Sequence, residues 1–171
     1  SLFPAILSSS VVIATGYSKT SLVIALLGSI MYLLHIRILD EYRDYDHDTV
    51  HHKDRPIQQG IITLSELQIL DTVLVITLGA IGLMYGIGTS IFIILMFAYS
   101  YIAGKEFFMG DRFKKYFFLY NSANLLQMIL MQCFVYSIFT ATFPTSSLVY
   151  LHFLFITLGT VIFELIRKIK N

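Results

Sequence analysis

A run of acidic residues in the segment 37–56 has a spacing that suits metal chemistry. The segment holds ten of the chain's 23 charged residues. If it is helical, three carboxylates and one arginine share a narrow stripe within about 60° of each other, namely Glu41, Asp44, Asp48 and Arg37. Asp40 lies at the edge of this stripe, whereas Asp46 lies on the opposite side. Carboxylates at this spacing repel one another. A hard divalent cation with oxygen ligands, such as Mg²⁺, would offset that repulsion.

Basic residues beside the stripe add charge that can pair with phosphate groups. They are Arg43, Lys53 and Arg55. Mg²⁺ is usually held by one or two carboxylates together with substrate phosphates, and guanidinium groups bind phosphate in bidentate fashion. The competing interpretation is a solvated acidic loop that pairs with its own arginines and lysines.

Three histidines in the same segment allow a second interpretation. His47, His51 and His52 resemble a histidine box of the kind that membrane di-iron desaturases and hydroxylases use, and imidazole is a good iron ligand. A di-iron site needs several such boxes. The remaining histidines, His35 and His152, stand inside apolar runs, so this interpretation is the weaker one.

The composition of the whole chain limits the class of protein to which these residues can belong. The chain has 171 residues, of which 56% are hydrophobic and 13% are charged. Soluble domains carry about 25% charged residues. An ordinary soluble domain, a disordered chain and a basic nucleic-acid binder are thereby excluded, and no nucleic-acid partner is expected. The single cysteine, Cys133, lies in an apolar run and gives no disulfide framework.

Six apolar runs predict transmembrane helices, because a spanning helix needs about 20 residues. The runs cover residues 2–15, 21–39, 67–84, 88–104, 116–143 and 147–166. We therefore predict an all-α fold, a polytopic transmembrane helical bundle with a single domain over residues 1–171. The first run is short and does not begin with Met, and the last run ends close to Asn171. We expect a piece of a longer protein, truncated at both ends.

Basic residues divide between the two sides that six helices would create. Lys19 is the one Lys or Arg on the first side, and the other eleven fall on the second. The positive-inside rule makes the second side cytoplasmic. The acidic stripe lies on that same side, so the sequence predicts a polar site that faces the cytoplasm.

The acidic stripe and its flanks resemble the first aspartate-rich motif of the UbiA family of intramembrane prenyltransferases. The family pattern is Asn/Asp-Asp-x-x-Asp-x-x-x-Asp, followed by Arg-Pro and a Gly. Here the matching positions are Asp40, Glu41, Asp44, Asp48, Arg55-Pro56 and Gly60. Glu41 departs from the usual Asp but keeps the charge. With Lys105-Glu-Phe-Phe-x-Gly110, the pattern resembles a bacterial subgroup whose substrates are poorly defined.

The resemblance implies a fold and an activity. It implies nine helices around a central cavity, of which about six are present, and a second acidic motif after the sixth helix. Because the last helices and that motif would be missing, these 171 residues by themselves are expected to be inactive. Glu164 and Arg167 stand near that place, where an ion pair at a helix end is the simpler interpretation. The implied activity is Mg²⁺-dependent transfer of an isoprenoid chain from an allylic diphosphate to an aromatic or other lipophilic acceptor, in the bacterial cytoplasmic membrane among membrane lipid.

The resemblance also implies roles for individual residues. The Mg²⁺ ligands and catalytic carboxylates would be Asp40, Glu41, Asp44 and Asp48. The substrate would be bound by Arg37, Arg55, Lys105, Arg112 and Asn124. Asn124 belongs to a polar stripe with Asn121 and Gln127, which could instead make hydrogen bonds between helices. Four tyrosines could face an allylic cation or form an interfacial aromatic belt: Tyr42, Tyr45, Tyr99 and Tyr101.

Two rival functions remain open. A membrane transporter or channel fragment could use the acidic mouth to bind cations without any catalysis, although we find no inverted repeats by inspection. A lipid phosphatidyltransferase would need Asp-Gly and Ala-Arg elements that are missing around the acidic run. Binding of an isoprenoid diphosphate that depends on a divalent metal separates a prenyltransferase from a transporter.

Overall fold

The computed structural model describes residues 19–105, 117–140, 143–145 and 147–169. These residues form helices and connecting turns, with no strand among them. The helices are α2 (Lys19–His51), α3 (Leu64–Tyr85), α4 (Ile87–Gly104), α6 (Phe117–Thr140) and α7 (Ser147–Ile169). The all-helical prediction is confirmed, and five of the six predicted runs are helices. The predicted first run, residues 2–15, lies outside the described part of the chain.

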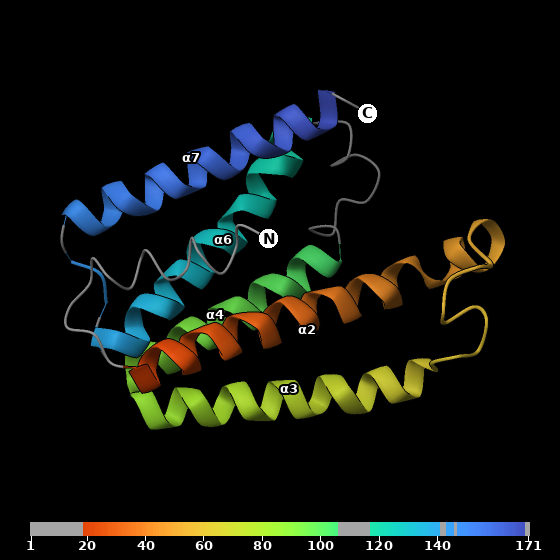
Figure 1. The fold of residues 1–171 in the computed structure, drawn as a ribbon, viewed down its shortest axis with the longest axis horizontal. Coiled ribbons are helices and arrows are strands. Elements are labelled where there is room, and N and C mark those ends of the chain that lie inside the picture. The colour runs from red at the N-terminus through yellow and green to blue at the C-terminus, as the bar shows by residue number, and fades with distance from the viewer. Residues whose placement is uncertain (1–18, 106–116, 141–142, 146, 170–171) are drawn as a thin grey trace.

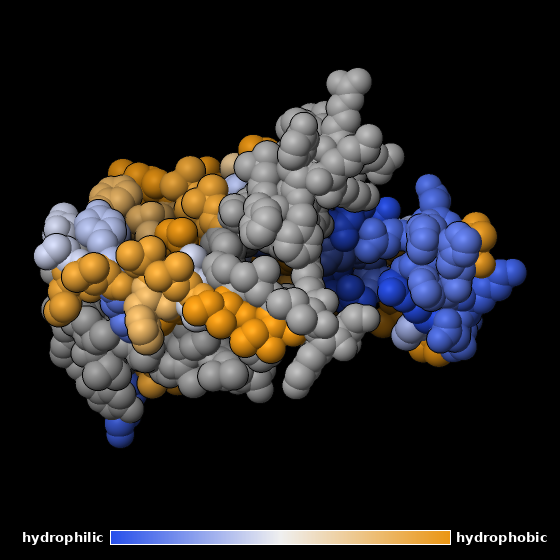
Figure 2. Space-filling model, turned by 90° about the horizontal axis from the view of Figure 1, so that it is seen from above, coloured by the Kyte–Doolittle hydropathy of each residue, from blue (hydrophilic) through white to orange (hydrophobic). Residues whose placement is uncertain are grey.

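The helices run up and down, so their ends gather at two opposite ends of the molecule (Figure 1). One end holds the start of α2, the turn between α3 and α4, and residues 143–145. The other end holds the end of α2, the loop 52–63 and the end of α4. Figure 2 shows hydrophilic side chains gathered at this second end, whereas much of the rest is apolar. Hydrophilic residues therefore concentrate at this end of the described structure, which we call the polar end, and its assignment to the cytoplasm stays a prediction.

Three helices, α2, α3 and α4, are long and apolar enough to cross a membrane. In α6 and α7 the described apolar stretches are shorter, over residues 126–140 and 147–159. Large apolar side chains point outward along these helices, as Val23, Leu27 and Ile30 do on α2. Such contiguous apolar surface is unusual on a soluble monomer. A bilayer accounts for it, because lipid tails cover apolar side chains at no cost.

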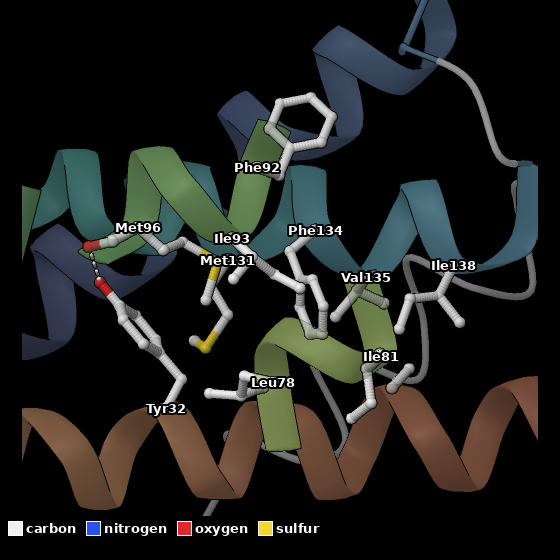
Figure 3. Packing of buried hydrophobic residues seen from close by; sticks show 11 residues of the cluster. Tyr32, Leu78, Ile81, Phe92, Ile93, Met96, Met131, Phe134, Val135 and Ile138 are labelled. Carbon is white, nitrogen blue, oxygen red and sulfur yellow. Dashed lines mark hydrogen bonds between the residues drawn. The ribbon is translucent and has the colours of Figure 1, made fainter. Parts of the chain in front are cut away.

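The core lies where α2, α3, α4 and α6 meet, and α7 packs against α6. Leu78 and Phe134 are fully buried there. Met96 also lies in this cluster, and its carbonyl oxygen accepts a hydrogen bond of 2.9 Å from the hydroxyl of Tyr32 (Figure 3). The amide of Gln127 donates to the same hydroxyl at 3.2 Å. Gln127 therefore links α6 to α2, which is the helix-to-helix role left open for that polar stripe.

The close approach of α2 to α6 depends on Gly28. A Cβ atom at this position would lie 2.8 Å from Cζ of Phe134, whose ring is fully buried. Small residues allow helix backbones to approach closely in a membrane. We expect Gly28→Ala to lower the free energy of unfolding by about 1–3 kcal/mol, because the ring can only move against its own packing.

Gly79 on α3 provides the matched control, since a Cβ there meets nothing within 4 Å. Gly79→Ala is expected to be neutral or slightly stabilising, because Ala favours a helix by about 1 kcal/mol over Gly. Thermal unfolding of both variants in the same detergent measures the difference. Equal midpoints for the two variants would show that Gly28 does not set the helix spacing.

The loop 52–63 ends where the residues Thr63 to Glu66 start α3. The hydroxyl of Thr63 accepts from the backbone N–H of Glu66 at 3.2 Å, and the carboxylate of Glu66 accepts from the backbone N–H of Thr63 at 2.8 Å. This is a capping box. The hydrogen bonds from the backbone and side chain of Thr63 lower the pKa of Glu66, so the carboxylate stays charged beside the positive helix end.

Candidate functional site

The acidic stripe lies on α2 itself, which continues for more than three turns beyond its apolar half. The helix holds its form to His51 because the segment contains neither Gly nor Pro before Pro56. Its first half lies among the apolar helices and its second half reaches into the polar end of the molecule (Figure 1). The prediction that the stripe extends the second membrane helix is confirmed.

Asp48 is the most buried carboxylate of the stripe. Only 3% of its side chain is exposed, and it forms an ion pair with Arg55, seven residues further on. The chain turns back after α2 through hydrogen bonds from the N–H of His52 to the carbonyl of Asp48 and from the N–H of Arg55 to the carbonyl of His52. Asp46 is exposed, as its opposite angular position predicts.

Glycine is required where the loop turns toward α3. Gly60 has φ of +73°, in the left-handed region that other residues adopt at a cost. Its N–H donates to the carbonyl of Ile57 at 3.0 Å. The turn between Asp48 and Arg55 brings the guanidinium of Arg55 to Asp48, and Gly60 then turns the chain again before α3.

The other stripe carboxylates pair with arginines of the same helix. Glu41 is bonded to Arg37, and Arg43 lies 3.0 Å from Asp40 and 2.9 Å from Asp44. The self-paired arrangement that competed with a metal site is therefore present in part. The arginines supply the positive charge that four neighbouring carboxylates require, and a divalent cation would have to share or replace it.

Asp40 is the stripe carboxylate whose charge its surroundings disfavour. Burial raises the pKa of Asp40 above its ordinary value, and the neighbouring charge of Asp44 raises it further, whereas Arg43 partly opposes the shift. A raised pKa means that this carboxyl holds its proton to a higher pH than an exposed aspartate. A cation at this position would reverse that effect, since it favours the charged form.

The three histidines at the end of α2 and just beyond it do approach one another. The His47 and His51 rings lie 4.6 Å apart between centroids, and possible ligand atoms of His47, Asp48 and His52 all lie within 4.8 Å of each other. Two imidazoles with one carboxylate suit transition metals better than Mg²⁺. The described ranges contain no other such group, and a di-iron site would need more. His35 is engaged elsewhere.

A pocket of about 300 Å³ opens beside the stripe, between the polar ends of α2 and α4. Its lining residues are Leu39, Tyr42, Arg43, Ser100, Tyr101, Gly104 and Lys105. It brings Lys105, predicted to bind the diphosphate, together with two of the four predicted tyrosines. Arg37 is largely exposed at the surface. Arg112 and the side chain of Asn124 fall outside what the structure describes, as do the side chains of Glu164 and Arg167.

One polar cluster, which shares Ser100 with this pocket, was missed from the sequence. His35 of α2 lies with Nδ1 at 2.6 Å from Asp71 of α3 and with Nε2 at 3.2 Å from the hydroxyl of Ser100 of α4. Asp71 was the residue that could have indicated this cluster from the sequence, because an acidic side chain within an apolar membrane run is costly unless it is paired or functional. His35 carried the same signal.

Comparisons of this chain with family models, with curated proteins and with solved structures each find no match.

Proposed function

We propose that this chain is part of an integral-membrane prenyltransferase, which transfers an isoprenoid group from an allylic diphosphate to an aromatic or other lipophilic acceptor. The observation that carries the proposal is Asp48, which is buried at the polar end of a helix of membrane length and faces Arg55 from the Arg-Pro turn. The resemblance to the first UbiA motif rests on these same positions.

The donor set suits Mg²⁺. The side chains of Asp40, Asp44 and Asp48 offer carboxylate oxygens along one side of α2, which is the ligand type that Mg²⁺ prefers. They could hold the ion jointly with the diphosphate, with Glu41 as a further ligand. The ion, once bound, neutralises the diphosphate and favours its departure from the allylic carbon.

The remaining parts of the site have roles in binding. Lys105 and Arg43 border the pocket and would pair with the diphosphate oxygens. Tyr42 and Tyr101 would present aromatic faces to the allylic cation. The isoprenoid chain would lie among the apolar helices, where the absence of water protects the cation from capture. Arg37, Arg55, Arg112 and Asn124 keep the binding roles that the resemblance implies.

Equilibrium binding of radiolabelled farnesyl diphosphate to the protein at its complete length in lipid nanodiscs tests this proposal. We expect binding that requires Mg²⁺, that is lost in Asp44→Asn and that is retained in Asp46→Asn, the exposed neighbour. A transporter or channel with a cation-binding mouth would instead carry divalent cations across proteoliposomes and ignore the diphosphate. That result would overturn the proposal.

A further inference from the structure

The cluster of His35, Asp71 and Ser100 draws one polar side chain from each of three membrane helices. His35 and Ser100 are 6% and 3% exposed, and 21% of the Asp71 side chain is exposed. The 2.6 Å and 3.2 Å contacts place the two ring nitrogens of His35 between a carboxylate and a hydroxyl. The order carboxylate, histidine, hydroxyl is that of a catalytic triad, in which the carboxylate orients the histidine and the histidine accepts a proton from the hydroxyl.

The hydroxyl of Ser100 has two possible acceptors, and this allows two protonation states. It lies 2.9 Å from the carbonyl oxygen of Phe97 and 3.2 Å from Nε2 of His35. With a neutral ring, Nδ1–H donates to Asp71 and the serine hydroxyl can donate to Nε2. With a charged ring, Nε2–H donates to the serine oxygen, and the hydroxyl turns to the carbonyl of Phe97. Each state satisfies its hydrogen bonds.

The position of the cluster connects it to the candidate site. Ser100 lines the pocket that also contains Lys105 and Arg43. The rings of Tyr32 and Phe97 pack against the ring of His35, with centroid distances of 6.1 Å and 4.9 Å. A proton can therefore reach His35 from the pocket through Ser100.

We propose that Ser100, His35 and Asp71 form a proton relay that accepts the proton released by the acceptor during prenyl transfer. The inference rests on the proposed function. The acceptor atom forms a bond to C1 of the prenyl group, and the bond between C1 and oxygen breaks with its electron pair passing to the diphosphate. The acceptor loses its proton to the oxygen of Ser100, whose own proton passes to Nε2 of His35. Asp71 stabilises the resulting imidazolium, which later gives the proton to water.

The experiment compares chemical outcomes in variants that remove single members of the relay. Ser100→Ala, His35→Gln and Asp71→Asn are assayed in proteoliposomes with farnesyl diphosphate and a panel of phenolic acceptors. Pyrophosphate, farnesol and prenylated acceptor are measured together. We expect the prenylated product to fall by about 10²–10⁴-fold, while pyrophosphate release falls far less and farnesol takes the place of product.

Ser137→Ala is the matched control. Ser137 is also buried, and its hydroxyl donates to the carbonyl oxygen of Phe134, three residues earlier, at 2.7 Å. The contacts of Ser137 within the described part of the chain include no histidine. This variant is expected to keep the wild-type ratio of product to pyrophosphate. Ser100→Thr, which restores a hydroxyl, is expected to recover most of the product that Ser100→Ala loses.

The outcomes separate this inference from the function on which it rests. A wild-type protein that forms neither pyrophosphate nor product refutes the prenyltransferase and the relay together. A wild-type protein that transfers the prenyl group, with all three variants keeping the wild-type ratio of product to pyrophosphate, refutes the relay alone. Thermal unfolding of each variant shows whether a fall in both pyrophosphate and prenylated acceptor comes from lost folding. In that case, the amount of prenylated acceptor formed by Ser100→Thr decides the role of the hydroxyl.

Discussion

Replacing Asp44 or Asp48 by alanine is expected to lower the rate of prenyl transfer by about a hundredfold or more. A metal ion that stabilises a leaving group contributes several kcal/mol, and each 1.36 kcal/mol corresponds to a factor of about ten in rate. Asp44 lies on the same side of α2 as the buried Asp48. The Mg²⁺ concentration for half-maximal rate should also rise, because a ligand has been removed.

Asp46→Ala is the control for these two variants, since Asp46 carries the same charge in the same segment but is exposed. It should reduce the rate less than twofold. Initial rates measured over a range of Mg²⁺ concentrations give both quantities. Similar losses in all three variants would attribute the effect to the overall charge of the segment and would remove the case for a specific metal site.

Arg55→Ala is expected to destabilise the protein in a way that added Mg²⁺ reverses. Asp48 would remain buried without its guanidinium partner, and a hydrogen bond to a charged group contributes about 1.5–3 kcal/mol. Arg55 is itself partly exposed, so we expect the lower part of that range. Millimolar Mg²⁺ should raise the unfolding temperature of this variant more than that of the wild type, because the cation can take the vacated position beside Asp48.

Lys53→Ala is the control, because Lys53 is an exposed cation of the same loop. Its unfolding temperature should match that of the wild type at every Mg²⁺ concentration. If Mg²⁺ raises the unfolding temperatures of the two variants equally, the ion acts on the general charge of the loop. Asp48 would then be a structural ion-pair partner of Arg55 and would not be a Mg²⁺ ligand.

The helices and their limits were readable from the sequence because local physics determines them. Long apolar runs can only be satisfied as helices in a membrane, and the capping box of Thr63 and Glu66 is a local pattern of two residues. The position of Asp46 on the side of the helix opposite Asp48 followed from helical periodicity alone. These features need no knowledge of which helix packs against which.

The partners of polar groups were not readable in the same way. The contacts of His35 with Asp71 and Ser100 join three helices across 36 and 65 residues of sequence, and no periodicity within one helix predicts them. The arginine pairs of Asp40, Glu41 and Asp44 were one of two open interpretations, because a carboxylate stripe attracts either a metal or a guanidinium. Only the packed arrangement places Ser100 on the pocket wall.

The central claim, that the site at the polar end of α2 catalyses prenyl transfer, is tested most directly by following product formation from radiolabelled farnesyl diphosphate. The protein at its complete length, in proteoliposomes, is given phenolic acceptors with Mg²⁺ or with EDTA. We predict a prenylated acceptor and an equal amount of pyrophosphate with Mg²⁺, neither with EDTA, and a loss of both in Asp48→Ala. Intact donor in every sample, together with divalent-cation flux across the vesicles, would contradict the account.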